Sequence, residues 1–144
     1  RIKKIKKFVD RVAVIYPFEV DFYAKHDVKA YYVGNPLLER AKPTLSRLQW
    51  CQKYQLNPAF NIIGLAPGSR IGEISRIFET LLQSASLLNK KIPNIQWVLP
   101  LASSITQEDL IPYLKAYSHL NIQFIDKEHT ELFSHCDLML ATFG

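Results

Sequence analysis

Residues 61–74 read NIIGLAPGSRIGEI and join an apolar run directly to the start of an amphipathic pattern. The run 62–66 has the length and composition of a buried β-strand. After the turn Pro67-Gly68-Ser69-Arg70, apolar residues recur at helical spacing along residues 73–88. They are Ile74, Ile77, Phe78, Leu81, Leu82, Ala85 and Leu88. A strand, a tight turn and a helix form the first half of a βαβ unit, which predicts a parallel sheet.

The same alternation occurs on both sides of this stretch. We predict further strands at residues 12–16, 30–33, 95–99, 122–125 and 138–141. We predict helices at residues 18–26, 107–117 and 130–135, with Thr106 as a possible N-cap of the second. Residues 37–60 are a polar, helix-rich connector in which Leu45, Leu48 and Trp50 are expected to pack. The fold class is therefore α/β, with one βαβ unit before the connector and a separate doubly wound parallel layer after it.

Length and composition are those of a globular protein. The chain has 144 residues, of which 48% are apolar, enough to bury a sizeable core. It begins without Met and stops after an apolar run, so we interpret it as a piece of a longer protein. Cys51 and Cys136 belong to no paired motif, which predicts reduced thiols in a cytosolic protein. No apolar run approaches the roughly 18–20 residues that span a bilayer.

The positive charge is confined to one segment. Residues 1–11 hold six Lys or Arg and one Asp, and the rest of the chain carries as many acidic as basic residues. This confinement argues against nucleic acid as a partner, because such a protein needs a basic face across its fold. Ile2, Ile5, Phe8 and Val9 share one helix face of the segment. That face contacts either anionic lipid headgroups or a protein core, and both alternatives remain open.

The turn after the 62–66 strand carries the best candidate for chemistry. Gly68 lets the backbone approach a ligand closely, and Ser69 can cap the helix or donate to an oxyanion. The first N–H groups of the following helix are free, and Arg70 offers a fork of donors that matches phosphate oxygens. Glu73 can orient Arg70 or complete a capping interaction. An ordinary turn with an exposed arginine is the alternative, since no Walker or GxGxxG pattern is present.

The other turns and strand-to-helix loops are weaker candidates for a functional site. Glu19 begins a helix, where the helix dipole accounts for a carboxylate. The segment Gly34-Asn35-Pro36 reads as a turn or hinge that can border a ligand cleft, and residues 142–144 can offer backbone N–H groups to an anion. A further strand-to-helix loop is expected at residues 100–104. His129 and His135, with the glutamates beside them, match no metal-ligand spacing, so we predict no metal site.

The motifs, taken in order, resemble lipid-A-disaccharide synthase, a family of bacterial GT-B glycosyltransferases with two Rossmann-like domains. The resemblance rests on Tyr16-Pro17-Phe18-Glu19, Phe22 and Tyr23, Lys25 and His26, Val33-Gly34-Asn35-Pro36-Leu37, Leu65-Ala66-Pro67-Gly68-Ser69-Arg70, Glu73 and Ile74, and the end at residues 137–144. It implies that residues 1–36 end the first domain, 37–60 connect the domains, and 61–144 begin the UDP-sugar-binding domain.

The resemblance also implies an activity. Such an enzyme moves 2,3-diacylglucosamine from its UDP conjugate to 2,3-diacylglucosamine 1-phosphate, giving the disaccharide precursor of lipid A. The anomeric centre is inverted in one displacement, without a metal or cofactor. The general base lies upstream of residue 1, so the chain is expected to be inactive alone. The enzyme would be cytoplasmic, peripherally associated with the inner membrane, and an oligomer is possible.

The resemblance assigns roles to individual residues. Arg70 would stabilise the departing diphosphate, which is electrostatic stabilisation where charge develops. The expected substrate-binding residues are Gly68, Ser69, Arg70, Glu73, Asn35 and Gly144. The chain departs from the family pattern twice: Asn35 stands where the family usually has His, and the bulky Phe143 stands where the family loop has Ser. The second departure leaves Gly144 as the contact expected from that loop.

Other functions remain open from the sequence. The peptidoglycan transferase that adds N-acetylglucosamine to lipid I shares Gly-Asn-Pro but has a Gly-Gly-Ser loop in place of Pro-Gly-Ser-Arg. UDP-N-acetylglucosamine 2-epimerase fits less well for the same reason. From other classes, residues 61–144 are also compatible with a non-catalytic nucleotide-binding module. An adaptor for membrane surfaces or nucleic acid would instead depend on residues 1–11.

Overall fold

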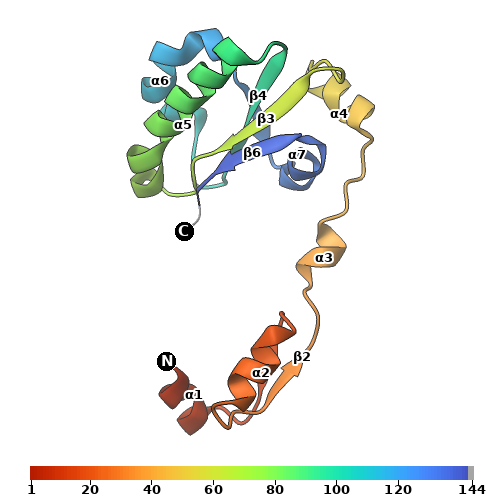
Figure 1. The fold of residues 1–144 in the computed structure, drawn as a ribbon, viewed down its shortest axis with the longest axis vertical. Helices are drawn as coiled ribbons and strands as arrows, with labels where there is room; N and C mark the ends of the chain where they lie inside the picture. The colour runs from red at the N-terminus through yellow and green to blue at the C-terminus, as the bar shows by residue number, and fades with distance from the viewer. Residues whose placement is uncertain (143–144) are drawn as a thin grey trace. The chain divides into compact units, whose positions relative to one another are not determined.

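The chain forms two compact units, which are described separately. A computed structural model describes residues 1–142, apart from the side chains of residues 39 and 40. Unit 1 is Arg1–Ala41 and unit 2 is Lys42–Gly144 (Figure 1). The predicted connector 37–60 is divided between them, because residues from 42 onward belong to unit 2. That the two units belong to two domains of an enzyme remains a prediction.

Unit 1 is a small βαβ element with a helix at each end. Its elements are α1 (Ile2–Phe8), β1 (Val12–Val14), α2 (Phe18–Ala24), β2 (Ala30–Tyr32) and α3 (Leu37–Arg40). The two strands are parallel, with Val12 opposite Ala30 and Val14 opposite Tyr32. The predicted βαβ unit is confirmed, although both strands are shorter than expected. Its buried apolar side chains are Val14 and Val28.

Unit 2 contains a four-stranded parallel sheet with helices on both faces. Its elements are α4 (Arg47–Lys53), β3 (Asn61–Ala66), α5 (Ile71–Lys91), β4 (Ile95–Leu101), α6 (Gln107–Leu114), the 3₁₀ helix η1 (Lys115–Leu120), β5 (Gln123–Asp126), α7 (His129–His135) and β6 (Leu138–Ala141). The strand order is β5-β4-β3-β6. The doubly wound layer predicted from the sequence is therefore confirmed.

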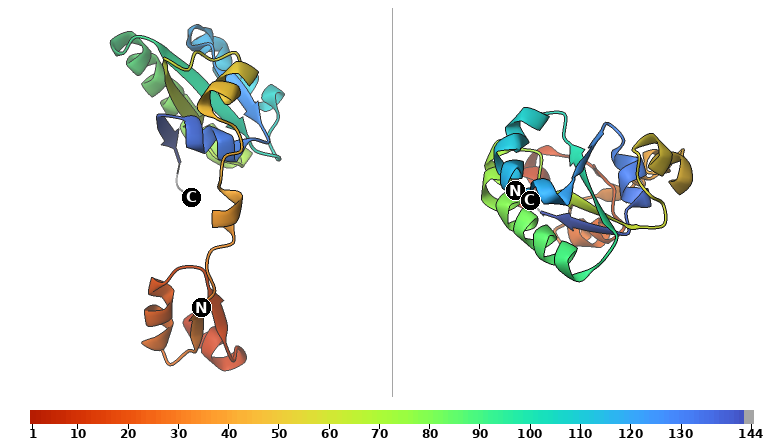
Figure 2. Two further views of the ribbon diagram at one scale, coloured as in Figure 1. Left: turned by 90° about the vertical axis from the view of Figure 1, so that its right-hand side faces the viewer. Right: turned by 90° about the horizontal axis from the view of Figure 1, so that it is seen from above.

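Alternating residues of β3 and β4 enter two separate cores. Ile63 and Leu65 of β3 pack with Phe78 of α5, in a cluster that also contains Trp97 and Leu99. Ile62 faces the other way, in a cluster that holds the Trp50 side chain of α4 and Leu132 of α7. Figure 1 and Figure 2 show α5 and α6 on one face of the sheet and α4 and α7 on the other. Burial on both faces explains the near-continuous apolar runs of these strands.

The helix starts follow local capping chemistry. Thr106 caps α6 as predicted. Its side chain accepts a hydrogen bond from the Asp109 N–H, and the Asp109 carboxylate accepts one from the Thr106 N–H. The predicted apolar face of α5 is also confirmed, with Ile74, Phe78, Leu82 and Ala85 buried. In the connector Trp50 is buried, whereas Leu48 is 54% exposed, so the prediction that Leu48 packs was wrong.

The strand β4 runs two residues further than predicted, to Leu101. The strand-to-helix loop expected at residues 100–104 therefore starts after Leu101. Pro100 lies inside β4, opposite Ile125 of β5 and beyond Val98, where the register shared with β3 ends. A strand tolerates proline where it has a neighbour on one side only, which explains the longer strand.

Two carboxylates attach the beginning of unit 2 to its sheet. Arg47 donates from Nη2 to Asp137 Oδ2 over 2.9 Å and to the Phe60 carbonyl over 3.1 Å. Asp137 also accepts from the Ile62 N–H at 2.7 Å. Burial would raise the pKa of Asp137, but the bonds from Arg47 and Ile62 outweigh it and lower the pKa. This network fixes the starts of β3 and β6 against α4.

The second carboxylate, Glu131 of α7, is buried. Its Oε1 accepts from the Thr44 N–H at 2.6 Å, the Thr44 hydroxyl at 2.8 Å and the Leu45 N–H at 3.3 Å. His135 Nε2 lies 3.0 Å from the Leu45 carbonyl oxygen and 3.2 Å from Glu131 Oε2, so this nitrogen carries a proton. Burial raises the pKa of Glu131, but these hydrogen bonds prevail and the pKa is lowered. Glu131 thus clamps residues 44 and 45 onto α7.

Candidate functional site

The carboxyl ends of β3, β4 and β6 surround a cavity of about 510 Å³, within the usual range for ligand sites. It lies where the strand order reverses, because the chain proceeds from β3 through β4 to β5 and then returns to β6 on the other side of β3. Ligands of open parallel sheets bind at such switch points. The lining residues are Ala66, Gly68, Ser69, Arg70, Glu73, Pro100, Ala102, His129, Phe133, Ala141 and Thr142.

Gly68 is required by the loop between β3 and α5. Its φ is +116°, a conformation that side-chain-bearing residues rarely adopt. A Cβ at this position would lie 2.6 Å from Glu73 Oε2 and 3.0 Å from Glu73 Cβ. The positive φ, together with the Glu73 side chain packed against the loop, favours glycine at this position.

Ser69 is held by its backbone on two sides. Its N–H donates to Glu73 Oε2 at 3.1 Å, and its carbonyl accepts from the Ser104 hydroxyl at 2.6 Å. The prediction that the Ser69 side chain caps the helix was wrong, because the N-cap of α5 is Arg70 and no side chain caps it. The other predicted role of Ser69, donation to an oxyanion, remains a prediction. Ser104 ties the loop to the segment after β4, a contact that the sequence did not indicate.

Arg70 and Glu73 form an ion pair over the first turn of α5. Arg70 Nη1 lies 2.9 Å from Glu73 Oε1, and the side chains are 81% and 33% exposed, respectively. The bond from the Ser69 N–H and the contacts with Arg70 lower the pKa of Glu73 against the effect of burial. The predicted interaction between Glu73 and Arg70 is thereby confirmed. The guanidinium stays accessible from the cavity, and this pair uses one of its five N–H groups.

The structure brings four of the six predicted binding residues together: Gly68, Ser69, Arg70 and Glu73. Asn35 belongs to unit 1, where its Oδ1 accepts from the Leu37 N–H at 3.0 Å in a local turn. Gly144 lies outside the described residues. The Thr142 N–H donates to the Ala66 carbonyl at 3.2 Å, so the end of β6 lies beside the start of the loop. Ligand contacts by Asn35 and Gly144 remain predictions.

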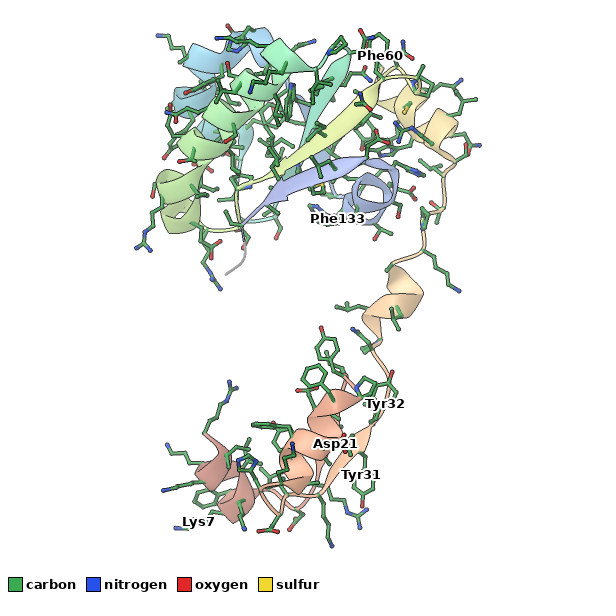
Figure 3. The ribbon with its side chains drawn as sticks, viewed as in Figure 1. Lys7, Asp21, Tyr31, Tyr32, Phe60 and Phe133 are labelled. Atoms are coloured by element: carbon green, nitrogen blue, oxygen red, sulfur yellow. The ribbon has the colours of Figure 1, made fainter. Side chains whose placement is uncertain are left out.

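Sequence analysis missed the aromatic wall of the cavity. His129 and Phe133 lie four residues apart on one face of α7 and line the same cavity as Arg70. Phe133, labelled in Figure 3, is 60% exposed. The spacing of His129 and Phe133 just after a predicted strand was an available signal, but Phe133 was not considered and His129 was only rejected as a metal ligand. Within residues 1–142 no group of His, Cys, Asp and Glu is arranged to hold a metal ion.

Comparison with known proteins identifies the family. The family model described as lipid-A-disaccharide synthetase matches residues 1–144, the whole chain. The chain belongs to this family. The resemblance noted from the motifs is thereby confirmed, and the parallel α/β layers fit the Rossmann-like GT-B fold expected for lipid-A-disaccharide synthetases. Membership places the chain in this family and not in that of the peptidoglycan transferase or the epimerase.

Individual relatives agree with the family match. The chain is 43% identical to a lipid-A-disaccharide synthase of Geobacter metallireducens, 40% to one of Geobacter sulfurreducens and 38% to one of Nitrosococcus oceani. Each alignment covers 100% of this chain and 37% of the relative. The chain thus spans little more than a third of the length of these lipid-A-disaccharide synthases. Among the described residues, no helix is long and apolar enough to cross a membrane.

Proposed function

We propose that the complete protein carrying this chain transfers 2,3-diacylglucosamine from its UDP conjugate to 2,3-diacylglucosamine 1-phosphate. In this proposal the cavity of unit 2 binds the UDP part of the donor. The observation that carries the proposal is Arg70, an accessible arginine at the carboxyl end of β3 and the start of α5, beside the switch point of the sheet. Family membership and the printed names of the relatives support the choice of donor and acceptor.

The chemistry is a single displacement at the anomeric carbon. The bond from this carbon to the diphosphate oxygen breaks, and a hydroxyl of the acceptor sugar forms the new bond from the opposite face. The hydroxyl proton goes to a general base outside residues 1–144. The bonding electrons leave with UDP, so negative charge grows on its diphosphate. Arg70 and the positive end of α5 stabilise that charge in the transition state.

The aromatic wall of the same cavity suits the nucleoside. His129 and Phe133 of α7 line the same cavity as the loop that carries Arg70. A flat ring can stack on such side chains, whereas a diphosphate needs the donors of the loop. In this proposal the uracil ring lies against α7, and Gly68, Ser69, Arg70 and Glu73 form the diphosphate end. Roles of Asn35 in unit 1 and of Gly144 in donor binding are proposed from the family resemblance alone, and the proposal requires no metal or cofactor.

A peripheral site at the cytoplasmic face of the inner membrane fits lipid substrates. The helix α1 of unit 1 carries four lysines in seven residues and no buried side chain. Phe8 at its end is 74% exposed, and Lys7, labelled in Figure 3, is exposed beside it. Exposed lysines beside an apolar ring are the side chains that anionic membrane surfaces attract. This surface supports the proposed peripheral association.

The test is turnover of the complete protein with Arg70 replaced. We expect Arg70→Ala to reduce kcat at least tenfold with unchanged circular dichroism, because loss of one such donor costs about 2.7–4 kcal/mol of transition-state stabilisation. Arg76→Ala is the matched control, since Arg76 is an exposed arginine on the same helix that does not line the cavity. Unchanged turnover in Arg70→Ala would contradict the proposal. A non-catalytic nucleotide-binding module would show no turnover in either protein.

A further inference from the structure

The carboxylate of Glu73 accepts from two of the donors that a phosphate would otherwise use. Its Oε2 binds the Ser69 N–H at 3.1 Å and its Oε1 binds Arg70 Nη1 at 2.9 Å. A negatively charged group in this place has two possible roles. Either a phosphate expels it and takes over both donors, or it stays and fixes the direction of Arg70. These roles predict opposite effects when the carboxylate is removed.

We propose that Glu73 stays in place as a positioning residue that aims Arg70 at the diphosphate without contacting the ligand itself. The inference rests on the proposed function and changes the role expected for Glu73 from ligand binding to positioning. It concerns the same cavity, which both residues line. Its consequence is that the contribution of Arg70 to turnover and to UDP binding depends on Glu73.

Packing around Gly68 shows how Glu73 is held. The glycine Cα lies so close that an added Cβ would meet Glu73 Oε2 at 2.6 Å and Glu73 Cβ at 3.0 Å. The carboxylate is therefore packed against the loop backbone, and two-thirds of the Glu73 side chain is shielded from solvent. A ligand phosphate that expelled it would have to break this packing and both hydrogen bonds. Arg70, in contrast, is 81% exposed and accessible.

A second attachment makes the loop a fixed platform. The Ser104 hydroxyl donates to the Ser69 carbonyl at 2.6 Å, so the peptide groups on both sides of Ser69 are hydrogen-bonded. Arg70 follows directly and begins α5, while Glu73 lies in the first turn of the same helix. An unrestrained arginine loses side-chain entropy when it binds an anion. The ion pair with Glu73 restrains Arg70 before the ligand arrives.

The charge of Arg70 remains available to the ligand in this arrangement. A guanidinium has five N–H donors, and the pair with Glu73 uses one nitrogen, Nη1. The negative charge of Glu73 repels a bound diphosphate. The proposal therefore requires that the orientation of Arg70 by Glu73 strengthens UDP binding more than this repulsion weakens it. The sign of the change in UDP affinity therefore decides between positioning and expulsion.

The experiment is a double-mutant cycle in the complete protein. The variants are Arg70→Ala, Glu73→Ala, Glu73→Gln and the pair Arg70→Ala with Glu73→Ala. Glu79→Ala is the matched control, because Glu79 lies on the same helix and its carboxylate binds Tyr117 instead of the loop. For each variant, kcat, the donor KM, the Kd of UDP and the circular dichroism are measured.

We expect Glu73→Ala to lower kcat about tenfold, to change the donor KM less than threefold and to weaken UDP binding. Glu73→Gln keeps an acceptor for the Ser69 N–H but loses the ion pair, so its kcat should fall about threefold. In the Arg70→Ala background, Glu73→Ala should change kcat less than twofold, since no arginine remains to be positioned. If Glu73 had only a structural role, Glu73→Ala would lower kcat by the same factor whether or not Arg70 is present.

Four results would overturn the inference, and the last would overturn the proposed function too. Tighter UDP binding by Glu73→Ala would mean that the carboxylate competes with the ligand. An equal loss of kcat on Glu73→Ala with and without Arg70 would mean that Glu73 acts independently of Arg70. A large effect of Arg70→Ala with none of Glu73→Ala would remove the positioning role and leave the proposed function standing. An unaffected Arg70→Ala variant would overturn the proposed function as well.

Discussion

Two glutamates of unit 2 make the same kind of contact in different surroundings. Glu73 accepts the Ser69 N–H and pairs with Arg70, while Glu131 accepts the Thr44 and Leu45 N–H groups and pairs with His135. Each therefore fastens a loop to the helix that carries the glutamate. The basic partner is 81% exposed in the first case and 10% exposed in the second.

This difference in exposure separates a functional contact from a structural one. Water can replace the lost partner at an exposed site, so removing Glu73 should cost little folding free energy. Glu131 is buried and its hydrogen bonds are partly shielded from solvent, so water replaces the lost acceptor poorly and removing Glu131 leaves partly buried donors unsatisfied. Burial of the partner, more than the chemistry of the pair, therefore predicts whether a substitution changes activity or stability.

The largest effect on this comparison should come from Glu131→Ala. It leaves the part-buried N–H groups of Thr44 and Leu45 without their acceptor, and an unsatisfied group shielded from water costs about 1–3 kcal/mol. We expect a loss of about 3 kcal/mol in unfolding free energy, measured by urea denaturation of the complete protein. The folded fraction should keep its kcat. Glu108→Ala, at an exposed position in the first turn of α6, is the control and should change stability by less than about 0.5 kcal/mol.

The comparison would fail if Glu131→Ala left stability unchanged and lowered turnover. That result would give the buried clamp a functional role and would remove burial as the criterion that separates the two glutamates.

A smaller effect is expected from Gly68→Ala, which disturbs the exposed contact from the loop side. A side chain at φ +116° is strained and would press on the Glu73 carboxylate, at a cost of about 1–3 kcal/mol. We expect this cost to appear mainly as weaker UDP binding, measured by calorimetry on the complete protein. Gly72→Ala is the matched control for folding. A Cβ there meets nothing within 4 Å, and alanine stabilises a helix by up to about 1 kcal/mol relative to glycine. Equal UDP affinity of Gly68→Ala and the unmodified protein would show that the loop shape is unimportant.

The smallest effect concerns pH and isolates the buried glutamate. The pKa of Glu131 in the folded state lies below its ordinary value of 4.5. Its ionised form therefore contributes stability above that value, and this contribution is lost as the pH falls through the folded-state pKa. Glu131→Gln, which cannot ionise, should show a shallower loss of unfolding free energy from neutral pH into this acidic range. Parallel curves for the two proteins would contradict the assigned cause of the shift.

Much of the fold followed from local sequence patterns. The apolar run before Pro67 and the helical spacing after it predicted β3 and α5, and the capping residue Thr106 marked the start of α6. Strand ends were less predictable, because pairing partners decide them: β4 continues through Pro100 since β5 still pairs with it there. Leu48 was mistaken for a packing residue because the connector pattern did not show which side of α4 faces the sheet.

The candidate site was predicted on one side only. The loop residues are adjacent in sequence, and their chemistry was visible in the motif. His129 and Phe133 reach the cavity from a helix about sixty residues later, through the return of the chain to β6. Likewise, the hydrogen bond from Ser104 to Ser69 and the clamp of Thr44 on Glu131 join distant segments. Such contacts depend on the strand order, which one sequence does not specify.

The most direct test of the central claim, that the loop with Arg70 binds the donor diphosphate, compares two ligands that differ only in phosphate. The Kd of UDP and of uridine is measured by calorimetry on the complete protein and its Arg70→Ala variant. The account predicts at least tenfold weaker binding of UDP by the variant, while uridine binds both proteins equally. Equal UDP affinity in the two proteins, or an equal loss for UDP and uridine, would contradict it.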